Sequence, residues 1–254
     1  MNWRHEVKFI LDETAFHRLY FGLKPIMYQD RHAVPTEPAG FPAYRIRSLY
    51  FDDIGLKGVF DKLAGNNPRH KFRIRIYQGS HQYIRLEKKI KSGNMTQKRS
   101  CRLDREQTDR LLAGDWASLH DETLESLRKN PDRTRRQQLH LLLQFYAENR
   151  TQLLEPHLLV DYQRVPLIFP AGNVRITFDR FLSTGIYRKD LWDPGAALQP
   201  VFNDGRLIME VKYDRFLPDF IRSAIRYPGL SPFAVSKYVQ CAGICRQQSW
   251  EDQV

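Results

Sequence analysis

Charged residues occupy every second position in several segments of this chain, with apolar residues between them. In the clearest segment, residues 71–76, Lys71, Arg73 and Arg75 alternate with Phe72, Ile74 and Ile76. A period of two is typical of a β-strand, because successive side chains point to opposite faces of the sheet. The same alternation recurs at residues 45–47, 85–91, 174–179 and 209–213.

A single strand of this kind would be an ordinary half-solvated strand, but five of them with mostly cationic polar faces indicate something else. If the sheet closes on itself, the charged faces can line a lumen while the apolar faces pack against helices. A lumen of Arg and Lys would bind a long polyanion, and phosphate chains fit best. The alternative is that these are outward faces of solvated strands. It is weaker, because the opposite faces are aliphatic and the sequence supplies helices to cover them.

The composition limits the size and the partners of the protein. The chain has 254 residues, and 40 Lys and Arg against 29 Asp and Glu give a net charge of +11. Such a balance predicts an acidic partner: nucleic acid, an anionic membrane surface or a polyphosphate-type substrate. Since we find no repeat or linker, we expect one domain over residues 1–254.

The cysteines and the apolar runs indicate a cytoplasmic location, free or peripherally attached. Cys101, Cys241 and Cys245 show no zinc or redox spacing, which favours free thiols in a reducing compartment. The first residues contain no apolar signal core. No apolar run approaches the ~20 residues that a membrane span needs.

Periodicity and punctuation predict alternating strands and helices. Asp12 and Asp104 are expected to cap helices, and the Pro and Gly residues of segments 31–43 and 192–205 predict loops. Strands are predicted at 4–11, 44–51, 70–78, 82–91, 95–103, 157–164, 173–179 and 206–213. Helices are predicted at 12–24, within 52–67, at 104–114, within 121–150 with a break near Pro131, and at 215–227 and 232–246.

The alternation assigns a set of charged residues to the lumen in which cations outnumber acids. Buried charges must be paired or hydrogen-bonded, so some of these cations need a bound anion or water. The predicted lumen cations are Lys8, Arg45, Arg47, Lys71, Arg73, Arg75, Lys89, Lys91, Lys98, Arg164, Arg175 and Lys212, and the acids are Glu6, Glu87, Asp179 and Glu210.

Glu210 is the acid that we single out, because its strand is otherwise strongly apolar. A carboxylate in a basic lumen can anchor Mg²⁺ or Mn²⁺, which complete their shells with phosphate oxygens and water. The alternative is an internal salt bridge to a neighbouring Arg. We find no P-loop, no G-x-S-x-G motif and no metal-ligand spacing among the eight histidines.

Taken together, short segments of the chain resemble the vacuolar transporter chaperone (VTC) domain, the polyphosphate polymerase branch of the triphosphate tunnel metalloenzymes. The matching segments run in family order over nearly the whole chain. They are residues 5–9, 49–52, 71–77, 86–89, 161–164, 174–179, 208–212 and 236–238. The resemblance implies an α+β fold: a closed eight-stranded antiparallel β-barrel with helices packed on the outside and a charged tunnel within.

The resemblance also implies roles for individual residues. Glu210 would bind Mn²⁺ or Mg²⁺, and the substrates would be ATP and inorganic polyphosphate or pyrophosphate. The expected catalytic residues are Lys8, Arg73, Arg75, Arg175 and Lys237, and the matching phosphate-binding residues are Lys89, Lys98, Tyr162, Arg164 and Ser236. The alternation adds Arg45, Arg47 and Lys212 to the binding set.

The first hypothesis is therefore a polyphosphate polymerase, with three alternatives. The first alternative is a hydrolase of tripolyphosphate or a nucleoside triphosphate. That branch opens with E-x-E-x-K, whereas here Lys8 of the segment Glu6-Val7-Lys8 stands where a second acid would be. The second is a non-catalytic polyphosphate-binding module, which would use the same cations. The third and weakest is a nucleic-acid binder, for which buried alternating cations fit less well than an exposed groove.

Overall fold

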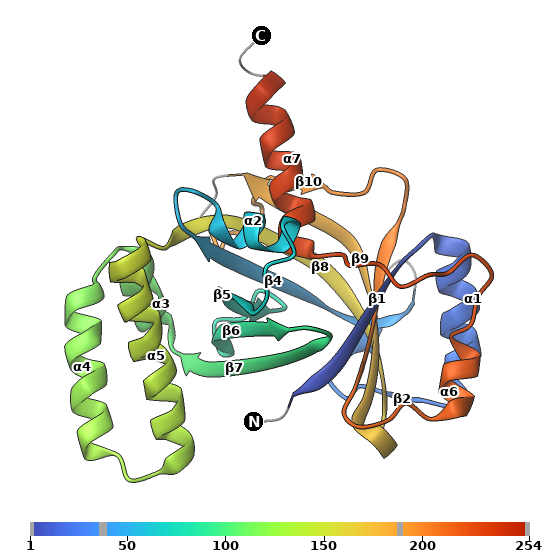
Figure 1. Cartoon of the computed structure of the whole chain (residues 1–254), viewed down its shortest axis with the longest axis horizontal. Coiled ribbons are helices and arrows are strands. Elements are labelled where there is room, and N and C mark those ends of the chain that lie inside the picture. Colours follow the sequence, from blue (N-terminus) through green and yellow to red (C-terminus); the bar gives the residue numbers. More distant parts are fainter. Residues whose placement is uncertain (1–2, 36–39, 187–189, 252–254) are drawn as a thin grey trace.

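A closed antiparallel barrel forms the centre of the protein (Figure 1). The computed structural model describes residues 3–35, 40–186 and 190–251. Around the barrel the strands follow the order β1-β7-β6-β5-β4-β8-β9-β11, and β11 pairs with β1 to close the ring. Its eight strands are β1 (Arg4–Leu11), β4 (Pro42–Asp52), β5 (Arg69–Tyr77), β6 (Ile84–Ser92), β7 (Met95–Leu103), β8 (Glu155–Phe169), β9 (Val174–Ile186) and β11 (Leu207–Tyr213). The predicted fold is confirmed.

The pairing of the first strand with the last brings together charged residues that lie far apart in the sequence. β1 and β11 are in register over their whole length, with Lys8 opposite Glu210 and Glu6 opposite Lys212. On its other side β1 meets β7 only at two residue pairs, one of which is Arg4 with Thr96. The barrel therefore closes with the acids and lysines of β1 and β11 side by side.

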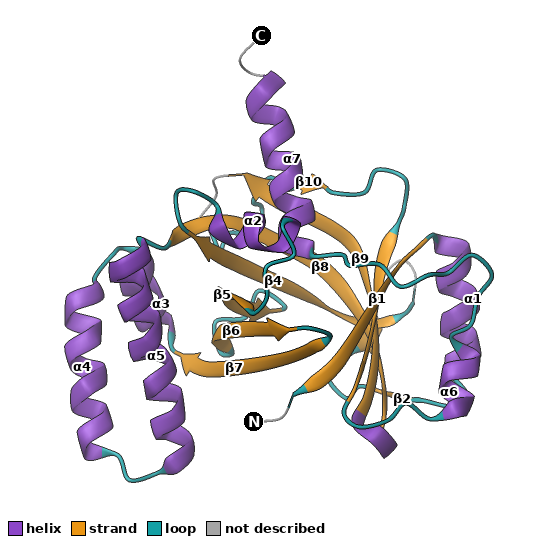
Figure 2. Cartoon of the chain, in the orientation of Figure 1, coloured by secondary structure: helices purple, strands orange, loops and turns teal. Residues whose placement is uncertain are grey.

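Helices cover the outer face of the barrel in two groups (Figure 2). α1 (Glu13–Leu23) and α6 (Asp219–Ala224) lie on one side. α3 (Arg105–Leu112), α4 (Trp116–Lys129) and α5 (Arg133–Gln152) lie on the other. The apolar faces of the strands point outward and pack under these helices, as the alternation predicted. For instance, Phe178 of β9 lies against Phe16 of α1, with ring centroids 5.0 Å apart.

The predicted caps are present at two of these helices. The Asp12 carboxylate accepts a hydrogen bond from the Ala15 backbone N–H at 2.7 Å. Asp104 accepts from the Gln107 N–H at 2.7 Å, and the Gln107 side chain accepts in return from the Asp104 N–H. Each cap satisfies a backbone donor that has no partner within its own helix.

One end of the barrel is closed by α7 (Lys237–Glu251), beside the short α2 (Lys57–Leu63). The start of α7 packs against apolar residues that face inward from β4, β8, β9 and β11. In particular, Tyr238 stacks on Tyr50 with ring centroids 4.9 Å apart. The interior of the barrel is therefore apolar at this end and charged elsewhere.

The structure extends or shortens several predicted elements. β8 and β9 continue past the predicted 157–164 and 173–179, because their added residues pack on α1 and on α7. α6 and α7 begin later than predicted, and residues 230–236 run as an irregular segment. The short strands β2 (Tyr28–Gln29), β3 (Val34–Pro35) and β10 (Gln199–Pro200) pair at the sheet edges, the last two within predicted loops. Within the described ranges, no helix is long and apolar enough to cross a membrane.

Candidate functional site

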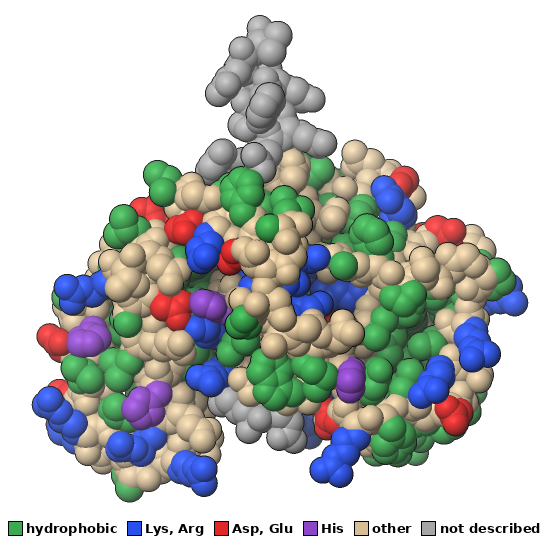
Figure 3. Space-filling view, in the orientation of Figure 1, with side chains coloured by type: hydrophobic (Ala, Val, Ile, Leu, Met, Phe, Trp, Pro, Cys, Tyr) green, Lys and Arg blue, Asp and Glu red, His purple; other side chains and the backbone are tan. Residues whose placement is uncertain are grey.

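A cavity of about 500 Å³ lies inside the barrel, between β1, β5, β6, β11 and the start of α7. Lys and Arg side chains lie in a hollow in the middle of the face shown in Figure 3. Ten of the predicted site residues line the cavity: Lys8, Arg73, Arg75, Lys89, Tyr162, Arg164, Glu210, Lys212, Ser236 and Lys237. The alternation therefore placed most of these side chains on the correct face.

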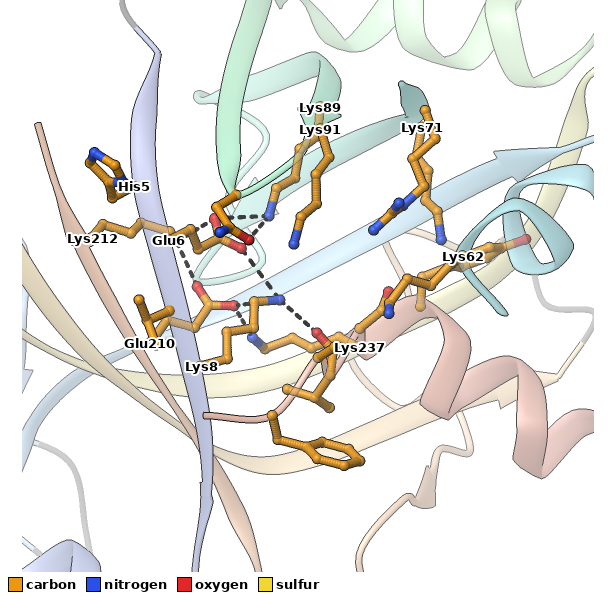
Figure 4. Close-up of a pocket in the computed structure, with 18 of the residues that line it drawn as sticks. His5, Glu6, Lys8, Lys62, Lys71, Lys89, Lys91, Glu210, Lys212 and Lys237 are labelled. Carbon is orange, nitrogen blue, oxygen red and sulfur yellow. Dashed lines mark hydrogen bonds and ion pairs between the residues drawn. The ribbon is translucent and has the colours of Figure 1, made fainter. Parts of the chain in front are cut away.

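Glu210 lies buried in the cavity wall, among three lysines (Figure 4). Its carboxylate accepts hydrogen bonds from Lys212 at 2.6 Å and from Lys237 at 2.7 Å, and Lys8 lies 3.4 Å away. Burial raises the pKa of Glu210, but Lys212, Lys237 and Lys8 outweigh it and hold the pKa well below its usual value. Glu210 is therefore ionised at neutral pH, and its charge is shared among these three lysines and Arg164, which donates to it at 3.4 Å.

Glu6 provides a second carboxylate in the same wall. It accepts two hydrogen bonds from Lys89, at 2.8 and 3.0 Å, and Lys8 lies 3.4 Å away. Lys212, which bonds Glu210, also lies 3.8 Å from Glu6. The two acids thus share Lys8 and Lys212. The number of acids in the segment Glu6-Val7-Lys8 therefore does not distinguish a polymerase from a hydrolase in this protein, because Glu210 supplies a second carboxylate beside Glu6.

Two acids behind the cavity surface hold the arginines in place. Glu87 is 1% exposed and accepts from Arg73 at 2.7 and 2.9 Å. Burial raises the pKa of Glu87, but Arg73, Arg75 and Lys98 lower it well below the usual range. Arg73 also donates to the Tyr50 hydroxyl at 2.7 Å. Ionised Glu87 therefore fixes the guanidinium of Arg73 beside the cavity.

Asp179 plays the same part on the opposite wall. It accepts two hydrogen bonds from Arg164, both at 2.7 Å, and lies 2.5 Å from Lys237. Burial lowers the pKa of Lys237, but Asp179 and Glu210 outweigh this and raise the pKa above its ordinary value. Lys237 is therefore a permanent cation. We call the following set the central cluster: Glu6, Lys8, Arg73, Arg75, Glu87, Lys89, Arg164, Asp179, Glu210, Lys212 and Lys237.

The donor set fits a hard divalent cation that also uses substrate oxygens. In the part of the chain that the structure describes, no group of three or more His, Cys, Asp or Glu residues could hold a metal alone. Glu210 and Glu6 could supply one or two carboxylates, which is how Mg²⁺ is commonly bound together with phosphate oxygens. The ion pairs of Glu210 correspond to the salt-bridge alternative, although with lysines as the closest donors.

Two predicted residues lie on the wrong face of the barrel. Arg45 and Arg47 point outward, and each donates to Asp161 of β8 at 2.8 Å. The inward positions of β4 carry Tyr44, Ile46, Ser48 and Tyr50 instead. Their placement in the lumen was wrong because α7 fills this end with apolar side chains. Alternation alone does not show which of its two faces is inside.

Two further predicted residues face the interior but do not line the cavity. Lys98 donates to Glu87 at 2.7 Å, with its side chain half exposed. Arg175 donates to Asp30 at 2.6 Å and to the Tyr44 hydroxyl at 2.7 Å. Lys98 and Arg175 therefore add positive charge to the barrel interior but do not form part of the cavity wall.

The cavity also contains cations that were not among the predicted site residues. Lys71 and Lys91 were assigned to the lumen by alternation but given no role, and both line the cavity. Arg69 extends the alternation of β5 by one step. Lys62 comes from α2, where no periodic signal points to the lumen. We call Lys62, Arg69, Lys71 and Lys91 the outer cluster.

Comparison with known proteins gives a family and two distant structural likenesses. The family model described as VTC domain matches residues 3–245. A Bacillus halodurans protein named as a candidate adenylate cyclase shares 11% identity over 88% of this chain and 87% of its own, with a TM-score of 0.45. The PH1819 protein of Pyrococcus horikoshii OT3 shares 13% identity over 87% and 84%, with a TM-score of 0.36. No curated protein sequence matches the chain.

The family match spans nearly all of the chain, including every strand of the barrel and the start of α7. It agrees with the order of the sequence segments and with a basic cavity enclosed by eight antiparallel strands. This chain therefore belongs to the VTC domain family.

Proposed function

We propose that this protein is a metal-dependent polyphosphate polymerase that extends an inorganic polyphosphate chain from ATP. The observation that carries the proposal is the position of Glu210. It lies in a basic cavity, shared by Lys8, Lys212 and Lys237, in a chain of the VTC domain family. A phosphate chain that draws these lysines to its own oxygens leaves Glu210 available for a cation.

The transfer replaces one phosphoanhydride bond by another. A terminal oxygen of the acceptor phosphate attacks the γ-phosphorus of ATP, the new P–O bond forms, and the bond to the β-phosphate oxygen breaks to release ADP. The attacking oxygen is already ionised at neutral pH, so the reaction needs no strong base. The residues of the chain therefore contribute position and charge, which are the main sources of acceleration in phosphoryl transfer.

Under this proposal, particular side chains make these contributions. Arg73 and Arg164 are each fixed by a buried acid, so their guanidinium groups present preorganised donors to phosphate oxygens. Lys237 stays charged and can stabilise the negative charge that develops on the transferred phosphoryl group. A bound Mn²⁺ or Mg²⁺ would neutralise phosphate oxygens beside Glu210.

The test is incubation of the purified protein with ATP and Mn²⁺ or Mg²⁺. Products are separated on a gel stained for polyphosphate, and free phosphate is measured in parallel. We expect a polyphosphate ladder that disappears when chelator is added and in the Glu210→Gln and Lys237→Ala variants. If the protein binds polyphosphate tightly but forms neither a ladder nor free phosphate, the chain is a binding module and the proposal fails.

Hydrolysis of tripolyphosphate or ATP is the second candidate, and the position of Glu6 favours it. Glu6 and Glu210 together supply two carboxylates to one site. If water replaces the acceptor phosphate, the same arrangement yields orthophosphate. Free phosphate without a ladder would assign the protein to this activity.

A further inference from the structure

The cations along β5 change in character from one end of the strand to the other. Arg75 and Arg73 are held by Glu87, Ser48 and two tyrosine hydroxyls. Two residues before Arg73, the Lys71 ammonium is buried and has no hydrogen-bond partner among the described residues. It lies instead over the ring of Tyr238, 4.5 Å from the ring centroid. Along β5, the arginines at the centre of the cavity are therefore hydrogen-bonded, whereas Lys71 nearer its edge is not.

The other members of the outer cluster lack acidic partners as well. In the described ranges of the chain, no Asp or Glu lies within ion-pair distance of Lys62, Arg69 or Lys91. Arg69 donates to the Asn66 carbonyl at 2.7 Å, which is a neutral acceptor. Arg69 lies opposite Lys91 in the β5–β6 pairing, and Lys71 lies opposite Lys89. In Figure 4, Lys62 and Lys71 lie across the cavity from Glu6 and Glu210.

Repulsion within this group also appears in the pKa values of its lysines. The pKa of Lys71 is lowered to about 7, chiefly by burial, with Arg69 and Lys8 adding to the decrease and Asp52 opposing it. Burial also lowers the pKa of Lys62 and of Lys91. Arg69 and Lys8 lower both pKa values further, while Glu6 opposes the decrease at Lys91. An uncompensated buried charge is costly unless a partner arrives. A polyanionic ligand in the cavity can supply that partner.

We propose that the outer cluster is a chain-length subsite, which binds phosphate units beyond the three that the central cluster accommodates. The tunnel-facing row from Arg69 to Arg75 covers seven residues of extended strand, and the six steps between them span about 20 Å. A triphosphate on the central cluster is too short to occupy this whole row, whereas a longer linear polyphosphate can. The subsite therefore discriminates between short and long phosphate chains of the same chemistry. This inference rests on the proposed function for the identity of the ligand.

The test compares two ligands on one protein, with chelator present so that only binding is measured. Dissociation constants for tripolyphosphate and for a homogeneous long-chain polyphosphate are determined by calorimetry on the full chain. The variants are Lys62→Gln/Lys91→Gln and, separately, Lys71→Gln. The matched control is Lys24→Gln/Lys129→Gln, which removes the same charge from exposed positions at the C-terminal ends of α1 and α4, outside the cavity.

We expect the outer variants to weaken long-chain binding by about tenfold for each lysine removed, since charge-assisted hydrogen bonds are lost. Tripolyphosphate binding should change less than about twofold, a difference that corresponds to a small free-energy change. The control should bind both ligands like the wild type. An equal loss for both ligands would show a general effect of charge and would overturn the subsite, as would no loss for either.

The outcome is independent of whether the protein polymerises. If no ladder forms in the activity assay but binding still depends on chain length as expected, the proposed polymerase fails and the subsite stands. If a ladder forms and the outer variants bind both ligands like the wild type, the polymerase stands and the subsite fails. Because Lys62 and Lys91 are half-buried side chains at the edge of the cavity, their replacement leaves the barrel core unchanged.

Discussion

The central and outer clusters of the cavity differ in whether their cations form ion pairs with acids. In the central cluster each lysine or arginine lies near a buried carboxylate, as Arg164 does near Asp179 and Lys212 near Glu210. In the outer cluster, Lys62, Lys71 and Lys91 form no ion pair within the described residues, and Asp52 and Glu6 attract Lys71 and Lys91 only from beyond ion-pair distance. A paired cation is held in one geometry but must exchange its partner to bind phosphate. An unpaired cation binds phosphate without giving up another partner. The fixed geometry of the central cluster therefore suits catalysis, and the outer cluster suits binding of the phosphate chain.

The largest expected effect comes from Glu210, the acid that three lysines of the central cluster share. Glu210→Gln should lower the proposed polymerase activity by about 10²–10³-fold, the size seen when one charged or polar group is removed from a preorganised site. Binding of polyphosphate in chelator should stay equal or become tighter, because Lys8, Lys212 and Lys237 are released. Gel analysis of products and calorimetry measure the two quantities.

The matched control for this variant is Glu122→Gln, which removes an exposed carboxylate that pairs with Arg110 far from the cavity. Its activity should equal that of the wild type. If Glu210→Gln still formed a ladder at the wild-type rate, the acid would have no role in catalysis, and the contrast between the clusters would lose its chemical meaning.

A second test separates the two clusters by stability. Glu87→Gln leaves Arg73 and Arg75 without their buried acid and should destabilise the protein by about 3–5 kcal/mol. By contrast, Lys62→Gln/Lys91→Gln should remain within about 1 kcal/mol of wild type, because no ion pair is lost. Urea unfolding at neutral pH measures both.

The lowered pKa of Glu87 also predicts how the stability of the wild type changes with pH. The folded pKa of Glu87 lies below its unfolded value. Its contribution is therefore fully present above the unfolded pKa and is lost as pH falls toward the folded one. Glu87→Gln should lack this part of the acid destabilisation. Equal stability of Glu87→Gln and wild type at neutral pH would contradict the account of the central cluster.

A smaller effect is expected from pH on the outer cluster. The pKa of Lys71 is about 7 in the free protein, so its charge is present below pH 7 and is lost above it. Binding of a phosphate chain favours the charged form and raises that pKa. Long-chain affinity should therefore fall severalfold, about the value of one weakened ion pair, as pH rises from 6 to 8.5.

Lys71→Arg supplies the comparison, because an arginine keeps its charge across this range. Calorimetry at each pH should give a flatter profile for Lys71→Arg than for wild type with the same ligand. The groups that face Lys71 are Asp52, Arg69, Lys8 and Lys89. Identical pH profiles for the two proteins would remove Lys71 from the explanation.

The smallest effect is expected at Arg45, and its comparison with Arg75 tests the two faces of the sheet. Arg45 points outward to Asp161, whereas Arg75 points into the cavity and donates to the Tyr162 hydroxyl at 3.1 Å. Arg45→Gln should change polyphosphate affinity by less than about twofold, while Arg75→Gln should lower it by about tenfold. Similar losses for both would mean that net charge, and not placement inside the barrel, governs binding.

Most of the barrel and most of the central cluster could be predicted from the sequence. The strands β1, β5, β6, β9 and β11 alternate clearly, and one face of each is aliphatic, so the charged face had to turn away from the covering helices. The helix caps were equally readable, because Asp12 and Asp104 act on backbone groups only a few residues away. These features depend on local geometry, which sequence spacing records.

The tertiary structure alone decided which face of β4 is inside, where each lysine finds its acid, and that α2 brings Lys62 to the cavity. The period of a strand comes from its own backbone, so it is visible in the sequence. The inside of a barrel is set by what packs there, and at one end that is α7, nearly two hundred residues from β4 in the chain. Arg45 and Arg47 were misplaced for this reason. Ion pairs such as Glu210 with Lys8 exist only because the last strand closes on the first.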